Sequence, residues 1–492
     1  MFFEIELLIL IVMLGSYVAL MKLCKLSSGV SLMVSALLGM LLGTIFNGTP
    51  FSFRFFVEGS FSYLDTIITI CVAMICISLM KLTGILDYFS TKIIRLLGKI
   101  PSLLVIVLAL IVMFPAMVTG TAISSAVTTG AIVLPILIKW GVPKQKAAAF
   151  IVTESIIGQV CPPVNLPAML ICDVVDVAFN GFELPLLAMS IPLAIFSAII
   201  LTREYVKPIT DENISEIVNV DIEKELNFTC LIPLLLVIVF MVAEVIWPKY
   251  LAIFGITLTF AVAAVLSIFL GKKTKFFTNF DDKESIVGNL LDCTKNVLPI
   301  AGILMGIGAF MAVFTLVGVR GYLALNCTIM PKTLQVIFTI ILLPLLGGVS
   351  AYGSASIIGP SFALSFISSY DSVVLIAGLS LLASIGDFLP PTALSADYEA
   401  NQIGEKSWFK VTTAGISTII AMLVFGSLFS FIVSELVNGH FFGVEIGDIV
   451  GKLGNVFYLI VMLVGLVILG LTLFVYYMVK NPFNKNMSEE VK

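Results

Sequence analysis

Two short runs of small and hydroxyl-bearing residues stand out because their surroundings are strongly apolar. The first covers residues 118–125 (VTGTAISS) and the second covers residues 347–356 (GGVSAYGSAS). Small residues let a backbone approach a ligand closely, and hydroxyl groups form hydrogen bonds without carrying charge. Close helix packing in membranes also favours small residues, which is the alternative interpretation. We expect both runs to bind a solute, through Thr119, Gly120, Thr121, Ser124 and Ser125 in the first and Ser350, Gly353 and Ser354 in the second.

A pair of adjacent prolines follows each run within a later apolar segment, at Pro162-Pro163 and at Pro390-Pro391. Proline has no N–H group, so carbonyls one turn earlier lose their partners and become available to a cation such as Na⁺. The helix that resumes after the break offers free N–H groups to an anion, and Asn165 is placed as a polar contact or N-cap. The predicted solute contacts at the breaks are Pro163, Asn165, Thr392 and Ser395, with Pro162 and Pro390 beside the cation.

Two carboxylates, Glu154 and Asp387, are predicted at membrane depth. Glu154 lies eight residues before Pro162, and Asp387 lies three residues before Pro390. Ionisable residues inside a membrane are rare and usually functional, so each is a candidate cation ligand or proton carrier. The alternative is a protonated carboxyl that serves only as a structural hydrogen-bond partner. No basic residue is predicted at this depth, so an anion would be held by N–H groups, amides, hydroxyls and bound cations.

The run and the proline break form a repeat. Three features of the first half recur 229 residues later and two recur 228 residues later: Phe114-Pro115, Ser125-Ala126 and Gly130 match Leu343-Pro344, Ser354-Ala355 and Gly359, while Gly158 and Pro162-Pro163 match Gly386 and Pro390-Pro391. Chance similarity between two apolar stretches is the alternative. Two prolines in register, each pair downstream of a small-residue run, favour an internal repeat.

The composition places these features in a membrane. Hydrophobic residues make up 59% of the 492 positions and charged residues 12%, and the mean hydropathy is +1.13. A soluble chain has about twice that share of charged residues. The net charge of −4 predicts no nucleic-acid partner, and the eight scattered cysteines and single histidine predict neither disulfides nor a metal cluster. The N-terminus lacks a basic region, so we expect no cleaved signal peptide and a first membrane helix near residues 5–22.

The distribution of positive charge predicts the topology. With the N-terminus outside and the segments flanking Gly120 and Ser350 treated as re-entrant hairpins, 22 of the 27 Lys and Arg residues lie on the inside. The fold class is therefore an all-α polytopic membrane protein with about 11 transmembrane helices, two re-entrant hairpins and a cytoplasmic C-terminus. An amphipathic helix is expected over 83–100. The predicted parts are a first inverted repeat over 1–203 (hairpin 102–139, broken helix 147–177), a linker over 204–228, a second repeat over 229–434 (hairpin 333–368, broken helix 373–398) and an extra helix over 456–478.

Inverted repeats with interrupted helices are typical of secondary transporters. The motifs over residues 119–126 and 158–163, with Pro135 and Ala147-Ala148-Ala149 between them, resemble the large membrane subunit of TRAP transporters, and so does the run SIGDFLPPTA over 384–393. The resemblance spans roughly residues 100–410 and extends to the wider ion transporter superfamily, which includes dicarboxylate/sodium symporters. The sequence departs from the usual GSGSA-like tip at Gly120-Thr121-Ala122 and from the usual IxPPS-like break at residues 161–165.

The resemblance implies that the hairpin tips and breaks bind substrate and Na⁺ and that the protein works as an elevator. It implies Na⁺-coupled uptake of a small organic anion, with a carboxylate as the default, across a bacterial cytoplasmic membrane. It also implies two partners, a small membrane subunit and an extracytoplasmic solute-binding protein, although the chain could act alone. No cofactor is expected beyond Na⁺ as the coupling ion.

Other functions are less consistent with the sequence. An ATP-driven pump would need a GxxxxGK[ST] loop, and the sequence has none. An intramembrane aspartyl protease would carry a GxGD motif, but the residues before Asp387 read Ser384-Ile385-Gly386. No HExxH motif is present, so we expect no enzyme. A channel would show unsaturable conductance rather than saturable flux. The closest alternative is a Na⁺/H⁺ or other cation/proton antiporter of the same superfamily, which could use Glu154 and Asp387.

Overall fold

The structure is a computed structural model that describes residues 5–208, 226–246, 255–271, 285–348, 351–390, 393–441, 444–445 and 453–480. These residues are almost entirely helical. They form two bodies, which we call the scaffold and the core. The predicted linker over 204–228 lies largely outside the described residues.

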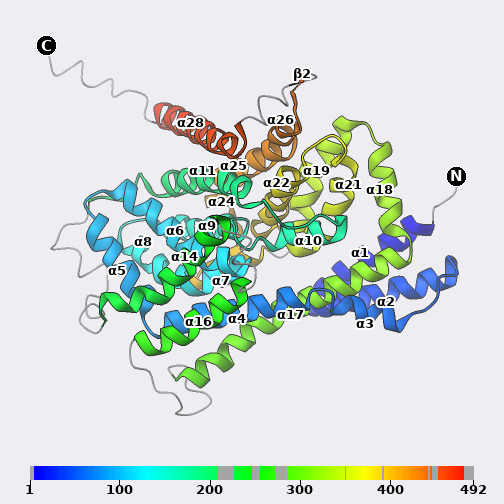
Figure 1. Ribbon diagram of the computed structural model, residues 1–492, viewed down its shortest axis with the longest axis horizontal. Helices are drawn as coiled ribbons and strands as arrows, with labels where there is room; N and C mark the ends of the chain where they lie inside the picture. Colours follow the sequence, from blue (N-terminus) through cyan, green and yellow to red (C-terminus); the bar gives the residue numbers. More distant parts are fainter. Residues whose placement is uncertain are drawn as a thin grey trace.

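The scaffold is built from helices at the start of each half of the chain. Its helices are α1 (Ile5–Lys22), α2 (Ser28–Phe46), α3 (Phe53–Ser60), α4 (Leu64–Leu82), α14 (Ile232–Ile246) with the short η2 (Phe228–Leu231), α16 (Gly255–Leu270) and α17 (Ile286–Leu316). The long α17 packs against α2, α3 and α4, while α4 and α14 pack against α16. In Figure 1 most of these helices run together along one side of the molecule.

Backbone contact between glycines holds the scaffold helices close. A Cβ atom on Gly306 would lie 2.5 Å from the carbonyl oxygen of Gly29, and one on Gly59 would lie 2.8 Å from that of Gly308. Small residues at such crossings let membrane helices approach closely and gain van der Waals contact. The helix α17 also begins at Ile286, well before the apolar run near residue 297, because Ser285 caps it by accepting a hydrogen bond from the Gly288 N–H.

The first half of the core follows α5 (Ile85–Leu97), which is bent by 63° from the end of α4. It contains α6 (Pro101–Thr119), the contiguous α7 (Ala122–Ser125), η1 (Ala126–Gly130) and α8 (Ala131–Lys139), then α9 (Lys144–Gln159), α10 (Leu166–Val175) and α11 (Glu183–Thr202). The segment η1 is a π-helical turn. Within this half α6 packs against α7, η1 and α9.

The second half of the core has the same order of elements. It contains α18 (Val319–Ile329), α19 (Lys332–Gly347), α20 (Ala351–Ile357), α21 (Gly359–Phe366), α22 (Ser372–Ser384) with η3 (Ile385–Phe388), α23 (Leu394–Gln402), α24 (Phe409–Ala414), α25 (Ile416–Ser427), the π-helical η4 (Leu428–Val433) and α26 (Ser434–Val437). A small antiparallel pair, β1 (His440–Phe441) with β2 (Val444–Glu445), follows. Buried residues of both halves share one large hydrophobic cluster, so the two halves form one body.

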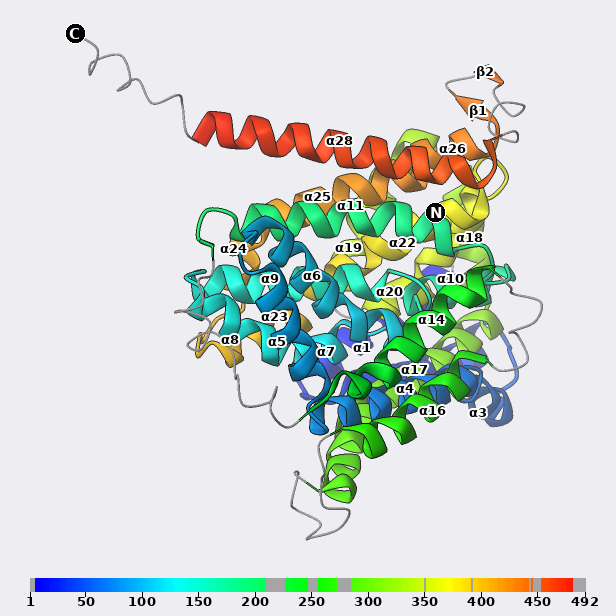
Figure 2. The same cartoon turned by 60° about the vertical axis from the view of Figure 1, so that its left-hand side comes forward.

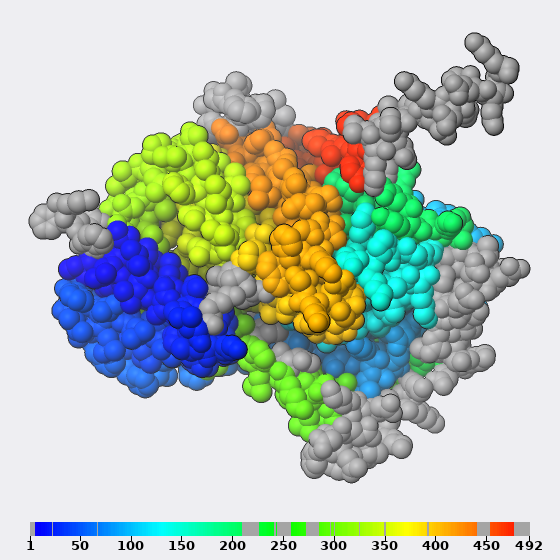
Figure 3. Space-filling view, turned by 180° about the vertical axis from the view of Figure 1, so that it is seen from behind, coloured from blue at the N-terminus to red at the C-terminus, as the bar shows by residue number. Residues whose placement is uncertain are grey.

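The last described helix, α28 (Asn455–Lys480), packs along α11 and presents much of its length outward. Figure 2 shows α28 lying across α11 and α25 at the edge of the molecule. Figure 3 shows the N-terminal helices in blue beside yellow-green segments of the second half, with the cyan segments of the core on the other side of the surface. The predicted extra helix over 456–478 corresponds to α28.

Length and hydropathy agree with a membrane location. Among the described residues, seven helices are long and apolar enough to cross a membrane, or eight if the bent pair α4–α5 counts as one span. The predicted all-α polytopic membrane protein is thereby confirmed. The number of 11 crossings, the re-entrant nature of the two hairpins and the orientation stay predictions.

Candidate functional site

We call residues 118–125 and 347–356 the first and second tips, and the turns at Pro162-Pro163 and Pro390-Pro391 the first and second breaks. The first tip is closed by hydrogen bonds among its own hydroxyl groups. The Thr119 hydroxyl lies 2.8 Å from the Pro115 carbonyl oxygen, 2.8 Å from the Ser124 hydroxyl and 3.1 Å from the Thr121 hydroxyl. Ser125 donates a hydrogen bond to the Val112 carbonyl of α6. All of these side chains are buried. They hold α7 and η1 against α6 as a hairpin whose turn lies inside the protein.

Gly120 makes the turn possible. Its φ of +67° lies in the left-handed region that favours glycine, and it ends α6. A Cβ atom here would also lie 2.6 Å from Leu166 Cγ, at the start of α10. The tip therefore seats directly against the helix that resumes after the first break.

Asn165 closes the first break. Its Oδ1 accepts a hydrogen bond from the Ala168 N–H at 3.0 Å, so it is the N-cap that the sequence suggested. Its amide nitrogen donates to the Val160 carbonyl at 3.1 Å and to the Ser380 hydroxyl at 2.9 Å. Val160 needs this partner because the N–H of Val164 donates instead to Met117 of α6. One amide thus satisfies backbone of the first half and contacts α22 of the second.

Gln159 makes a second link of this kind, which was not among the residues predicted from the sequence. Its Oε1 accepts a hydrogen bond from the Ala122 N–H at 2.8 Å, at the start of the tip's second arm. Its amide nitrogen donates to the Ser384 hydroxyl of α22 at 3.2 Å. The signal was present in the repeat, because Gln159 is the residue 228 positions before Asp387. The two halves therefore meet through amides and hydroxyls of α9 and α22.

The second break holds the carboxylate. Asp387 lies in η3 and is 8% exposed, and its Oδ2 accepts a hydrogen bond of 3.3 Å from the Ser395 hydroxyl. The Tyr352 hydroxyl of the second tip lies within electrostatic reach of this carboxylate and donates to the Gly120 carbonyl at 3.4 Å. The two tips and the second break therefore come together. Tyr352 was missed because one aromatic residue in a run of small residues has no periodic signal.

The remaining residues predicted in the second half have other contacts. Ser354 donates to the Leu343 carbonyl at 2.7 Å. Together with Gly353 it lines a small, partly open cavity, whose other walls are largely apolar and come from Leu14, Tyr17 and Val18 of α1 and from Leu346, Ile357 and Ile358. Pro390 is exposed, and the backbone of Gly348 packs on its carbonyl so closely that a Cβ atom would clash. Ser350 and Thr392 lie outside the described residues.

Glu154 lies apart from the tips. It is fully buried in α9, and its Oε1 accepts a 2.5 Å hydrogen bond from Ser197 of α11. None of the contacts described for Glu154 involves a tip or a break. Pro162 is buried and Pro163 is partly buried in the turn between α9 and α10. The structure thus groups Asp387 with the tips and places Glu154 on the far side of α9.

No cluster of three His, Cys, Asp or Glu side chains lies within the described ranges. A cation at this site would instead be held by Asp387, hydroxyl groups and backbone carbonyls at the tips and breaks, which are the hard oxygen ligands that Na⁺ prefers.

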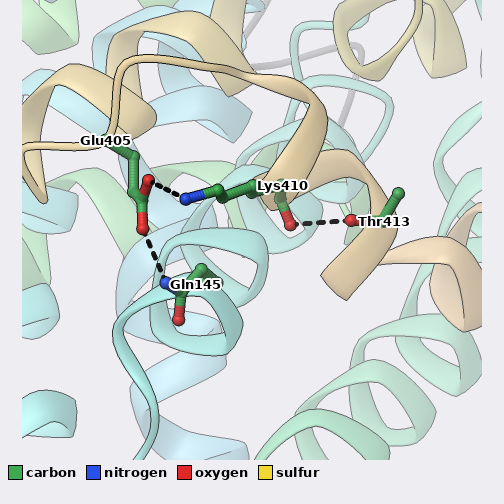
Figure 4. A network of polar contacts seen from close by, with 4 residues as sticks. All are labelled: Gln145, Glu405, Lys410 and Thr413. Atoms are coloured by element: carbon green, nitrogen blue, oxygen red, sulfur yellow. Dashed lines mark hydrogen bonds and ion pairs between the residues drawn. The ribbon is translucent and has the colours of Figure 1, made fainter.

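On the inner side predicted from the topology, a polar network joins the two halves (Figure 4). Glu405 accepts hydrogen bonds of 2.7 Å from Gln145 at the start of α9 and of 2.7 Å from Lys410 of α24. Thr413 donates to the Lys410 carbonyl at 3.0 Å. The Lys410 ammonium and the Gln145 amide lower the pKa of Glu405, so the carboxylate is charged at neutral pH.

The sequence matches the family described as "Tripartite ATP-independent periplasmic transporter, DctM component" over residues 14–436. This range covers most of the chain, and the chain belongs to this family. It is therefore a multi-pass inner-membrane component of a transporter and not an enzyme, as the sequence predicted. In this family the component works with a small membrane component and a solute-binding protein. The helix α28 lies beyond the matched residues.

Among solved structures, the chain is similar to the Alcanivorax borkumensis YdaH transporter, whose crystal structure is described as revealing an unusual topology. The identity is 14%, the TM-score is 0.50, and the similarity covers 80% of this chain and 88% of that one. At this identity the similarity concerns the fold. No curated protein matches the chain.

Proposed function

We propose that this protein is the large permease subunit of a tripartite system and carries a small organic anion into the cell by Na⁺-coupled symport. The observation that carries the proposal is the meeting of both tips with the second break at Gly120, Tyr352 and Asp387. A site at the interface of two halves of a chain can be exposed to either side of the membrane when the body that carries it moves against the scaffold.

The chemistry around this point suits an anion without needing a basic side chain. No Lys or Arg occurs within residues 102–138, 147–202 or 333–405, which contain the tips and breaks. The groups available are the hydroxyls of Thr119, Thr121 and Ser124 and the N–H groups at the start of α23, where no side-chain cap is described. A carboxylate bound by these groups keeps its charge only with a compensating cation nearby. Co-binding of Na⁺ is therefore the simplest way to neutralise the substrate.

Asp387 is the best candidate ligand for the coupling cation. It is buried, and the hydrogen bond from Ser395 occupies one of its two oxygens. Glu154 is the second candidate, and its Oε2 has no hydrogen-bond partner although the residue is fully buried. Asp387 is preferred because it lies beside both tips.

The two bodies support an elevator mechanism. Val164, Leu166, Leu170 and Val174 of the core pack into the same apolar cluster as scaffold residues of α1, α2 and α17. An apolar seam has no directional bonds that fix its register, so the core can slide along it. The cavity between α1 and the second tip lies on this seam. We further propose that residues 1–203 and 229–434 are inverted repeats, with the N-terminus outside.

The orientation has a direct test in the native cysteines. Cys24 is exposed, and it lies in the loop between α1 and α2 that the topology places inside. In intact cells a membrane-impermeant maleimide is expected to leave Cys24 unlabelled, and permeabilisation is expected to expose it. Labelling without permeabilisation would reverse the orientation.

Transport itself is tested in proteoliposomes that contain this chain together with its small membrane subunit, with the solute-binding protein added outside. We expect saturable accumulation of at least one member of a carboxylate panel when a Na⁺ gradient is imposed, and none when Na⁺ is equal on both sides. Omitting the solute-binding protein tests whether the chain works alone. If no solute accumulates and Na⁺ instead drives proton movement, the antiporter alternative replaces the symport proposal.

A further inference from the structure

The carboxyl group of Glu399 is buried. Glu399 lies on α23, one turn before the helix ends at Gln402, and only 1% of the residue is exposed. Neither Oε1 nor Oε2 has a hydrogen-bond partner among the residues that the structure describes. A Cβ atom placed on Gly130 would lie 3.5 Å from Oε1, so the carboxyl points at the π-helical turn η1 of the first hairpin.

The internal repeat shows that packing does not require a carboxyl here. The residue 228 positions before Glu399 is Ile171, and the residue 229 positions after Gly130 is Gly359. A Cβ atom on Gly359 would lie 2.9 Å from Ile171 Cγ1 and 3.7 Å from the Ser354 carbonyl oxygen. The corresponding atoms around Gly130 are Glu399 Oε1 and the Ser125 carbonyl oxygen, at 3.5 Å and 3.2 Å. The same contact is made by a methylene in one half and by a carboxyl in the other.

On the described elements that pack against α23, no charged group has a described contact with the Glu399 carboxyl. The helix α23 packs against α7, η1, α9, α24 and η3. Neither α7 nor η1 has an ionisable residue. The charged residues of α9, α24 and η3 have other partners. Lys146 lies over the Tyr205 ring, Lys144 interacts electrostatically with Glu405, Glu154 accepts a hydrogen bond from Ser197, Lys410 forms an ion pair with Glu405, and Asp387 accepts a hydrogen bond from Ser395. On α23 itself, Asp397 is exposed and Tyr398 is partly buried.

A buried carboxylate without a partner costs several kcal/mol, and the usual outcome is that it takes up a proton. We infer that Glu399 is a proton-binding site at the contact between the two halves of the core. While α23 is separated from η1, the carboxylate takes a proton from water on the inner side, and η1 then covers the neutral acid. Separation of α23 from η1 lets water reach the carboxyl, and the proton leaves. The polar network of Glu405 lies one short loop beyond α23, so the path to water is short.

A proton is favoured over a metal cation by the same contacts. Na⁺ requires several oxygen ligands, and no other side-chain oxygen is bonded to Glu399 among the residues that the structure describes. Proton binding by Glu399 can be measured without substrate and does not depend on the proposed function. Only a role of this proton in transport rests on the proposed function.

The test is infrared difference spectroscopy of the purified full-length protein in nanodiscs, titrated between about pH 5 and about pH 9 in the absence of substrate. The wild type is expected to show a carbonyl-stretch band of a protonated carboxylic acid that disappears on alkalinisation. Glu399→Gln is expected to lack one such band. Asp397→Asn, which removes an exposed carboxylate from the same helix, is expected to keep it. An unchanged spectrum in Glu399→Gln, or an equal loss in Asp397→Asn, overturns the inference.

Two further measurements separate proton binding from misfolding and from Na⁺ binding. Glu399→Ile installs the residue of the matching position in the first half and is expected to stay monodisperse and to lack the same band, which covers a failure of the glutamine variant to fold. Adding Na⁺ at fixed pH is expected to leave the wild-type band in place. Loss of the band on adding Na⁺ would assign the site to Na⁺ and overturn the proton assignment. If carboxylate uptake fails and the band behaves as described, the proposed function fails and the proton site stands.

Discussion

The two proline breaks have the same prolines but different ways of satisfying the backbone around them. At the first break, Asn165 caps α10 and also bonds the Val160 carbonyl. The matching position at the second break is Ala393, which has left-handed backbone (φ +45°, ψ +48°) and no capping side chain. The first break is closed by the protein's own amide, whereas the second is bordered by a carboxylate and an exposed Pro390.

The difference between the breaks indicates a division of roles. Amides at Gln159 and Asn165 occupy the groups that a ligand would otherwise use, so the first break mainly holds the two halves together. Among the described residues, the second break has fewer side-chain hydrogen bonds, so we expect a cation or solute to gain most by binding there. The substitutions below test this division, from the largest expected effect to the smallest.

Asp387→Asn is expected to reduce Na⁺-driven uptake by about a hundredfold, because removal of a charged cation ligand typically costs this much affinity or more. Uptake at several Na⁺ concentrations measures the effect, and Asp397→Asn is the control for loss of one negative charge. Retention of full Na⁺ dependence in Asp387→Asn would show that the second break does not carry the cation.

Asn165→Ala removes the α10 cap and leaves the Val160 carbonyl without its partner. We expect the free energy of unfolding to fall by about 2–4 kcal/mol and the substrate KM to rise, because a lost cap and a buried unpaired group add together. Thermal unfolding in detergent and uptake kinetics measure the two effects.

The control for Asn165→Ala at the matching position is Ala393→Gly. Ala393 is fully buried and has left-handed backbone, which glycine adopts more readily than alanine without adding volume or a polar group, so it is expected to be neutral or slightly stabilising. Equal destabilisation by both substitutions would contradict the division of roles between the two breaks.

Tyr352→Phe removes the hydroxyl that joins the second tip to Gly120. The bond is long at 3.4 Å, so we expect a cost of about 0.5–1 kcal/mol, which corresponds to a rise in KM of about threefold. Steady-state uptake measures the change. An unaltered KM would mean that the two tips contribute to binding independently.

Glu405→Gln tests the contact between the halves on the predicted inner side. The pKa of Glu405 is lowered in the folded protein, so its stabilisation is present at neutral pH and is lost as the pH falls below its ordinary value of about 4. We expect a small decrease in melting temperature at pH 7 that disappears at acidic pH. A difference that persists or grows on acidification would show that the charge of Glu405 is not involved.

Much of this architecture could be predicted because the chain follows local rules. Helix ends such as those of α1 and α4 coincide with the ends of apolar runs, and the left-handed Gly120 and the capping Asn165 have clear local signals. The tips and breaks could be located because their composition contrasts with the apolar surroundings.

What could not be predicted is the direction in which single side chains point between the halves. Gln159 lies in the part of α9 where every helix face is buried, so no amphipathic pattern reveals which neighbour it meets. The exposed residues of α23 share one face, so the pattern places Glu399 on the buried side but does not reveal that it meets η1. Glu154 shows the same difficulty, because its distance from Pro162 along the chain placed it near the break, whereas its helix face turns it toward Ser197. Such directions depend on the packing of segments more than 200 residues apart.

The glycine contacts of the scaffold have a mechanical consequence. The backbones of Gly29 and Gly306 are in direct contact, and so are those of Gly59 and Gly308. If one of these helices shifted along the other, side chains would enter the contact, which has no room for them. The seam between scaffold and core is instead lined by branched aliphatic side chains, which exchange neighbours at little cost. Under a shearing load we expect the crossings at these glycines to stay fixed and the aliphatic seam to yield, as the proposed elevator mechanism requires.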